Sequence, residues 1–165
     1  MLFRSANRGL GDSGNLSIVG DTVRLESGSR ISAETLVGNG GQLDFDLRVL
    51  ELDTGSILAT TVGPGQGGNI RIRASERVEI VGEGIATIRD LISTAATDPV
   101  EALGNSVGLI SGTARDGQAG DIAIDTGALV LRRGALIAPI TLGAGDAGRT
   151  TLRVAGDAID RKSVV

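Results

Sequence analysis

The chain has 165 residues, which is enough for one domain, and a formal net charge of -4 at neutral pH. It contains no Cys and no His, which excludes disulfides, imidazole catalysis and ordinary zinc sites. Gly contributes 26 residues whereas two Phe are the entire aromatic content, so the composition favours a narrow, layered interior of aliphatic side chains over a conventional globular core.

A five-residue glycine corner, G-[DNQ]-[SGA]-G-x, recurs five times. The copies are GDSGN (11–15), GNGGQ (38–42), GQGGN (65–69), GQAGD (117–121) and GDAGR (145–149), with starts 27, 27, 52 and 28 residues apart. This regularity predicts stacked copies of one supersecondary unit, the longest interval being a unit with an insertion. The predicted structural corner positions are Gly11, Gly14, Gly38, Gly41, Gly65, Gly68, Gly117, Gly120, Gly145 and Gly148.

Two segments with alternating apolar residues follow the corners. Such alternation, rich in β-branched residues, predicts strands with one buried face. The expected core residues of the first segments are Leu16, Ile18, Leu43, Phe45, Ile70, Ile72, Ile122 and Ile124. Those of the second segments are Val23, Leu25, Leu50, Leu52, Val78, Ile80, Leu129 and Leu131.

A small turn then leads into a third short strand. Its glycines, Gly28, Gly55 and Gly134, occupy one position when the units are aligned. On that alignment the inward pairs of the third strands are Ile31 and Ala33, Leu58 and Thr60, Ile110 and Gly112, and Ile137 and Pro139. Three short strands per unit predict an all-β fold, a parallel β-helix (solenoid) of about four to five coils.

Stacking in register also predicts columns of charge on the outer face. Asp46, Arg73, Asp125 and Arg153 fall in one column of alternating sign, an arrangement that stabilises a sheet by about 0.2–1 kcal/mol per pair. In the second segments Arg24 meets Glu51 favourably. Glu26, however, meets Asp53, and the sequence gives no reason for that pair.

Residues 83–106 lack both the glycine rhythm and a clean period, so they are expected to form a loop that leaves the coil and returns, with a helical turn or short strand around 85–92. The ends MLFRS (1–5) and DRKSVV (160–165) can be encoded by a sequencing adapter. We therefore expect them to be non-native, with residues 6–159 forming a β-helix fragment that can self-associate through its open ends.

Several consecutive units resemble the repeat region of large exoproteins of the filamentous haemagglutinin, two-partner secretion family, especially the cyanobacterial type. The segments that carry the resemblance are GNLSI (14–18), GGNIRIRASERVEI (67–80) and AGDIAIDTGALVLRRGA (119–135). The resemblance implies a right-handed parallel β-helix from a secreted or cell-surface adhesin, exported by an outer-membrane partner transporter. It implies neither catalytic nor ligand-binding residues, and it does not identify the receptor.

A carbohydrate-active β-helix enzyme, of the polysaccharide lyase or hydrolase type, is the alternative function. Its catalytic face would draw on the outward charged residues Asp44, Asp46, Asp53, Asp125, Arg71 and Arg73. The absence of an aromatic platform for sugar rings, and the alternating signs, favour a structural role for these charges instead.

Other ligands match the sequence less well. Calcium-binding β-rolls repeat every nine residues, unlike these corners, although incidental calcium at Asp12 or Asp146 stays an open alternative. We expect the polar residue of each corner to bond its own turn. The glycine-rich stretch 63–69 lacks the lysine and helix of a phosphate-binding loop. No basic cluster suits nucleic acid, and no catalytic residue, metal or cofactor is expected.

Overall fold

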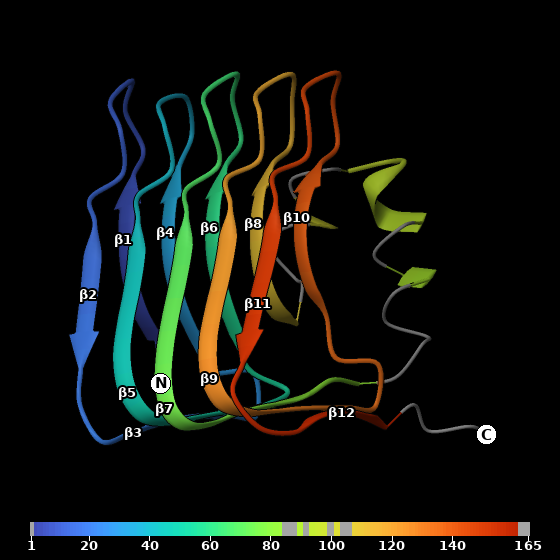
Figure 1. Ribbon diagram of the computed structural model, residues 1–165. Coiled ribbons are helices and arrows are strands. Elements are labelled where there is room, and N and C mark those ends of the chain that lie inside the picture. Colours follow the sequence, from blue (N-terminus) through green and yellow to red (C-terminus); the bar gives the residue numbers. More distant parts are fainter. Residues whose placement is uncertain (1, 84–88, 91–92, 99–100, 103–106, 162–165) are drawn as a thin grey trace.

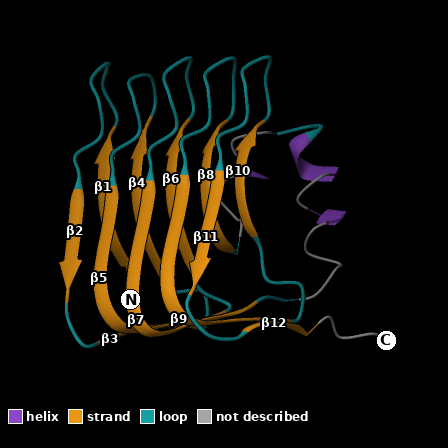
Figure 2. Cartoon of the chain, viewed as in Figure 1, coloured by secondary structure: helices purple, strands orange, loops and turns teal. Residues whose placement is uncertain are grey.

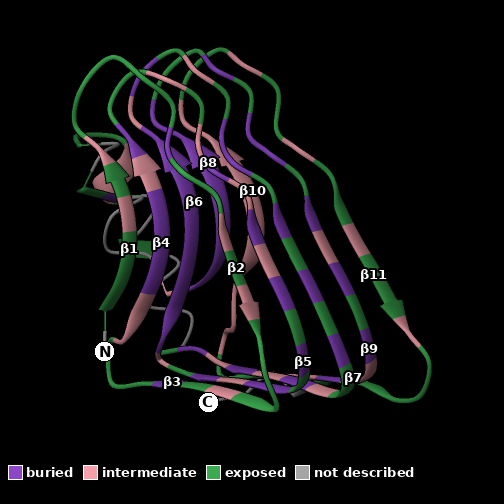
Figure 3. Cartoon of the chain, turned by 90° about the vertical axis from the view of Figure 1, so that its left-hand side faces the viewer, coloured by how far each residue is buried: buried purple, intermediate pink, exposed green. Residues whose placement is uncertain are grey.

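The computed structural model describes residues 2–83, 89–90, 93–98, 101–102 and 107–161. The chain is a β-solenoid of about five turns built almost entirely from parallel strands (Figures 1 and 2). When the solenoid is viewed from its N-terminal side (Figure 3), the chain turns clockwise as it recedes. The solenoid is therefore right-handed.

Two parallel sheets enclose the interior. The first sheet has the order β1-β4-β6-β8-β10. Its strands are β1 (Leu2–Asn7), β4 (Arg30–Thr35), β6 (Ser56–Thr61), β8 (Gly108–Thr113) and β10 (Ile137–Thr141). The second sheet has the order β11-β9-β7-β5-β2, with β3 beside β5 and β12 beside β9. Its strands are β2 (Leu16–Val19), β3 (Thr22–Glu26), β5 (Leu43–Asp53), β7 (Ile70–Val81), β9 (Ile122–Arg132), β11 (Thr150–Val154) and β12 (Ala158–Arg161).

In the middle coils of the solenoid, the first and second predicted segments are continuous. They form single long strands in β5, β7 and β9, which bend around one side of the interior (Figure 1). The β5–β7 register shifts between Leu47 and Val49, and the β7–β9 register shifts between Ala74 and Arg77. These irregularities mark the break between the two predicted segments, because a bulge bends a strand without ending it.

The interior is filled by aliphatic residues and one phenylalanine. The expected core residues that are buried are Leu25, Leu43, Phe45, Leu50, Leu52, Ile70, Ile72, Val78, Ile80, Ile122, Ile124 and Leu129. Leu16, Ile18, Val23 and Leu131 are partly buried and pack against the same cluster. Three of these four lie in β2 and β3, at the edge of the second sheet, where no further strand covers them.

In the third strands, the structure contradicts the sequence-based alignment of the inward residues. The structure pairs Ile31 with Ile57 and Ile57 with Leu109, and all three side chains belong to the main core. Leu58 and Ile110, which the alignment had placed inward, lie on the other side of the strand in a second apolar cluster. A shift of one residue moves every side chain to the opposite face of a strand. The inward residues that follow are accordingly Ala59 and Ser111, not Thr60 and Gly112.

A turn of different length causes this shift. In the first coil residues 27–29 separate the second strand from the third, and Ser27 and Gly28 among them have positive φ. In the next coil Thr54 alone has positive φ, and Ser56 already pairs with Arg30. The next corner starts on schedule at residue 65, so the lost residue is restored before it and the sequence period stays at 27.

The outer side of the first sheet is also covered. Leu58 and Ile110 are fully buried there, and the described parts of the insertion lie on that side of the sheet (Figure 3). Residues 89–90, 93–95 and 101–102 are helical, and Ala102 is buried. The predicted loop is therefore partly helical, whereas most of the segment expected around 85–92 lies outside the described residues.

The corner glycines stack in two columns because each backbone lies directly on the next. A Cβ on Gly41 would overlap the carbonyl oxygen of Gly14, and one on Gly68 would overlap that of Gly41. The later pairs repeat this contact: Gly65 on Gly38, Gly117 on Gly65, Gly120 on Gly68, Gly145 on Gly117 and Gly148 on Gly120. None of these glycines has a positive φ. The corner therefore requires glycine for close approach between coils, not for backbone conformation.

Polar corner side chains bond the next coil, contrary to the expectation that they bond their own turn. The Asp12 carboxylate accepts the backbone N–H of Asn39 at 2.6 Å, and the Asn39 amide oxygen accepts that of Gln66 at 3.0 Å. The last corner position repeats the pattern, since Asp121 Oδ1 accepts the N–H of Arg149 at 2.7 Å. These side chains bond the next coil because its corner N–H groups face them in register and need acceptors.

A column of threonines lies where the strands of the first sheet end and the chain enters the next corner. Thr35, Thr61, Thr113 and Thr141 pair in register at the ends of their strands. The Oγ1 atoms of Thr35 and Thr61 donate to the carbonyls of Gly11 and Gly38, each at 2.9 Å. This column faces inward, and Thr35, Thr61 and Thr113 are buried.

Candidate functional site

The outward charges proposed for the alternative enzyme lie in two separate places. Asp46, Arg73, Asp125 and Arg153 stack in one column of the second sheet, as the sequence predicts, and Asp44 stacks beside Arg71. Among the described residues no ion pair joins members of these columns, and the Asp44 carboxylate accepts from Gln42 Nε2 at 2.7 Å. Asp53 lies at the far end of β5, so the structure does not bring the proposed set together.

The densest charged cluster lies farther along these strands, on the outer face of β3, the ends of β5 and β7, and β9. It contains Glu26, Arg24, Glu51, Arg77, Glu79 and Arg132, which we call the ion-pair ladder. Consecutive members alternate in sign and link four neighbouring rows of the sheet. Their formal charges cancel, so the ladder is an electrically neutral contact between coils.

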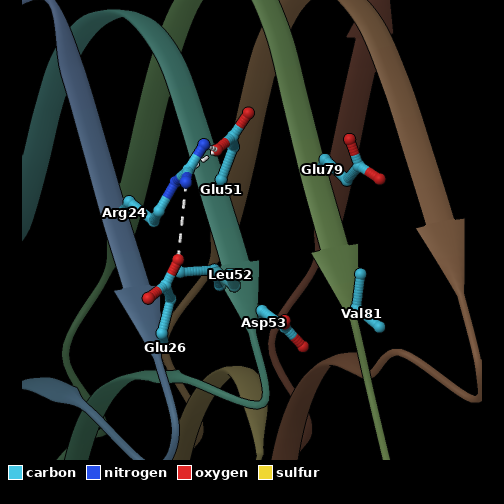
Figure 4. A pocket seen from close by; sticks show the side chains of 7 residues that line it. All are labelled: Arg24, Glu26, Glu51, Leu52, Asp53, Glu79 and Val81. Atoms are coloured by element: carbon cyan, nitrogen blue, oxygen red, sulfur yellow. Dashed lines mark hydrogen bonds and ion pairs between the residues drawn. The ribbon is translucent and has the colours of Figure 1, made fainter.

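Glu51 is the central acceptor of the ladder. Its carboxylate accepts from Arg24 Nε at 2.7 Å and from the guanidinium of Arg77 on the other side. Figure 4 shows the Arg24 guanidinium between the carboxylates of Glu51 and Glu26, the latter 3.5 Å from Nη1. This contact supplies Glu26 with a positive charge that partly offsets its register partner Asp53.

Arg77 and Arg132 separate the next pair of like charges. Glu51 and Glu79 are register partners, and Arg77 bonds the first carboxylate while its Nε lies 3.6 Å from the second. That Nε is buried and makes no hydrogen bond within the described structure. Arg132 Nε approaches the other oxygen of Glu79 at 3.3 Å. Arg77 thus bridges the like-charged pair Glu51 and Glu79.

A pocket of about 240 Å³ opens beside the ladder and is lined by Arg24, Glu26, Glu51, Leu52, Asp53, Glu79 and Val81 (Figure 4). Burial alone would raise the pKa of Glu51, but the hydrogen bonds from Arg24 and Arg77 outweigh it and lower the pKa. Glu51 therefore stays ionised at neutral pH. A glycosidase acid needs the opposite, a carboxyl whose pKa is raised so that it can donate a proton.

A second, more exposed group lies next to the ladder. The Arg48 guanidinium binds Asp21 at 2.6 Å and Glu76 at 2.6 Å, joining three successive coils. Its hydrogen bonds, with one from Thr22, lower the pKa of Asp21 to about 2. Both groups of charges connect neighbouring coils through ion pairs.

These ion pairs should make the solenoid acid-sensitive. Carboxyls with depressed pKa values stabilise the folded state above their unfolded pKa and lose that contribution as the pH falls through the folded value. For Asp21 this window runs from about pH 4 to about pH 2, and Glu51 adds to it. We expect Glu51→Gln to lower the free energy of unfolding at pH 7 by about 1–2 kcal/mol, and its difference from the parent chain to shrink on acidification.

Urea titrations at pH 7, 5 and 3 would measure this difference. Glu26→Gln is the matched control, because Glu26 is 57% exposed and has one weak contact with Arg24. Its expected cost at pH 7 is below about 0.5 kcal/mol. Equal costs for both variants, or a Glu51→Gln cost that is independent of pH, would contradict the assignment of Glu51 as the central acceptor.

Sequence reasoning found only part of the ladder. It paired Arg24 with Glu51, but missed Arg77, Glu79 and Arg132. The recurrence of charge at positions 24, 51 and 79 was the available signal. Arg77 was missed because it pairs in register with Val49 and reaches the Glu51 carboxylate diagonally.

Comparison with known protein families, with curated proteins and with solved structures found no match for this chain. In the part of the chain that the structure describes, no helix is long and apolar enough to cross a membrane. Within those same residues, no three acidic side chains come together as a metal site would require. The fold and the contacts between coils therefore carry the functional argument.

Proposed function

We propose that this chain is a structural shaft segment of a secreted cell-surface adhesin or haemagglutinin-like exoprotein, a non-catalytic spacer that displays loops. The observation that carries the proposal is the ion-pair ladder, in which the side chains best placed for chemistry bind one another between coils. Charged groups committed in this way stiffen a solenoid and are not free to receive a substrate.

Two further features support a shaft. Glycine columns and corner side chains join the coils by backbone contacts, so each coil depends on its neighbours, as in other solenoids. The resemblance of the repeats to filamentous haemagglutinin-type exoproteins agrees with the parallel β-helix. On this proposal the parent protein uses an outer-membrane partner transporter and binds a cell-surface or glycan receptor through other parts.

Insertion of segments of this chain into the shaft of a secreted exoprotein would test the proposal. Three tandem copies of residues 11–144, four complete units that end just before a corner, would be placed in frame within the shaft of a filamentous haemagglutinin-type exoprotein and produced with its transporter. We expect secretion and a filament that is longer by about 20 Å per copy, because parallel strands repeat every ~4.8 Å. Electron microscopy would measure the length, and adhesion should persist.

The same insert carrying Gly68→Ala in each copy is the control, since an unfolded insert cannot extend a rigid filament. Failure of the unmodified insert to be secreted or to lengthen the filament would count against a shaft. In parallel, the purified chain would be incubated with a panel of acidic and neutral polysaccharides. Release of reducing ends that Glu51→Gln abolishes would replace the proposal with the carbohydrate-active enzyme.

A further inference from the structure

Most large exposed apolar side chains lie at the two ends of the solenoid, the exceptions being Leu36 and Val37 after β4. Those at the N-terminal end are Leu2, Phe3, Leu10 and Val19, and those at the C-terminal end are Leu152 and Ile159. The strands at these ends, β1, β2 and β3 on one side and β10, β11 and β12 on the other, each have a neighbour on one side only within the described sheets. These strands therefore each have one free edge in the described structure, and Phe3 and Leu152 are the exposed apolar residues there that share a register column with core residues, Ile31 and Ile124.

The first corner carries glycines that the fold of a single chain does not require. In every later corner an added Cβ would overlap the backbone of the preceding coil. At Gly11 and Gly14 it would instead approach side-chain atoms only, Asn7 Nδ2 and Ser5 Oγ, each at 2.9 Å. Ser5 Oγ can turn aside, and moving Asn7 would cost its local bonds to the Asp12 carbonyl and the residue 9 N–H but would displace no backbone of another coil. Gly11 and Gly14 nevertheless present the bare backbone on which another corner can stack.

The two ends also have complementary shapes. Each sheet is five strands deep along the solenoid, counting β1 to β10 in one and β2 to β11 in the other. Because β1 precedes β2, the first sheet extends farther than the second at the N-terminal end. Because β11 follows β10, the second sheet extends farther than the first at the C-terminal end. The projecting part of one end fits the recess of the other.

We propose that this chain binds a second copy of itself head to tail, with corner 145–149 of one copy stacked on corner 11–15 of the next. The carbonyls of Gly145 and Gly148 then face Gly11 and Gly14 and continue both glycine columns. In the register that all internal coils share, Leu152 meets Ile18 of the next copy.

Contacts of this kind leave one free end on every assembly, so they build open filaments rather than closed rings. The proposal does not depend on the shaft function, because it concerns surfaces of this chain alone. Its central residues, the corner glycines, also lie inside residues 6–159.

Engineered cysteines test the register directly, because the chain has no cysteine of its own. Ser17 and Thr151 belong to one outward column, so they become neighbours across the proposed junction. Adjacent strands place their Cα atoms about 4.8 Å apart, within the range that a disulfide spans. Ser17→Cys and Thr151→Cys chains with different tags would be mixed and oxidised.

We expect a disulfide-linked heterodimer that carries both tags, and little dimer from either variant alone. The double variant should give a ladder of dimers, trimers and longer species on a denaturing gel. Homodimers from one variant alone, as abundant as the heterodimer, would show a different geometry and overturn the proposal. Absence of any cross-link at high protein concentration would overturn it as well.

A second variant separates association from folding. Gly11→Ala with Gly14→Ala should weaken association by about tenfold or more, because the new methyl groups collide with the next copy, while the monomer keeps its circular dichroism and unfolding midpoint. Gly41→Ala, in the same column but inside the solenoid, should instead lower the unfolding midpoint. Sedimentation equilibrium measures the association. Unchanged association of the Gly11/Gly14 variant would overturn the proposed stacking.

Discussion

Replacing Gly68 by Ala is expected to destabilise the solenoid by about 3 kcal/mol or more, beyond the usual cost of an added methyl group. The new Cβ would overlap the carbonyl oxygen of Gly41 and lie 2.8 Å from its carbonyl carbon and 2.9 Å from that of Gly40. All three are backbone atoms. They cannot move aside, because the flanking backbone is held by bonds between coils, such as Leu43 N–H to the Asn69 carbonyl at 2.9 Å.

Urea unfolding followed by circular dichroism would measure this cost, in dilute protein so that association does not contribute. Gly20→Ala is the matched control, because a Cβ there meets only the Leu47 side chain at 4.0 Å. We expect that variant to stay within about 0.5 kcal/mol of the parent chain. A Gly68→Ala chain as stable as the control would mean that the corners are not in backbone contact.

The contrast between these two glycines shows what the sequence could reveal. The period of 27 residues and the position of Gly68 in every corner were visible, and they led to the parallel β-helix. Gly20 falls outside the recurring pattern, and its surroundings are open. Recurrence therefore identified the four later corners, where glycine is indispensable, but it marked Gly11 and Gly14 equally, where no backbone of another coil lies against the glycine. It did not reveal the reason, because close approach and positive φ leave the same glycine in a sequence.

The sequence did not reveal changes in turn length that leave the 27-residue period unchanged. The turn at Thr54 is one residue shorter than the turn at Ser27 and Gly28, yet the next corner restores the count. An alignment built on corners therefore placed Leu58 inward, whereas the structure places it on the outer side of the first sheet in the second apolar cluster. Side-chain direction in a third strand depends on the exact turn length, and composition does not encode it.

The ion-pair ladder was partly hidden for a different reason. Stacking in register implies only which residues are neighbours, and by that rule Glu26 beside Asp53 is unfavourable. Arginine is long enough to bond residues in its own strand and in the next one, as Arg24 does with Glu26 and Glu51. Such diagonal contacts depend on side-chain conformation. They became visible only with the coordinates.

Replacing Phe45 by Ala should cost about 3–5 kcal/mol, the usual range for a fully buried phenylalanine. Phe45 is 2% exposed and stacks between Ile18 and Ile72 in the central column of the second sheet. It is the one aromatic residue of the interior, so its removal leaves the largest cavity that a single substitution can make here. Urea titration in dilute protein would measure the change in free energy of unfolding.

Phe3→Ala is the natural control, because Phe3 is the other phenylalanine of the chain and is 48% exposed on β1. Loss of its half-exposed ring should cost less than about 1.5 kcal/mol in the monomer. At high protein concentration the same variant should also weaken head-to-tail association, since Phe3 lies on the N-terminal end. Equal costs for the two variants in dilute solution would contradict the interior position of Phe45, on which the inward and outward faces of the second sheet depend.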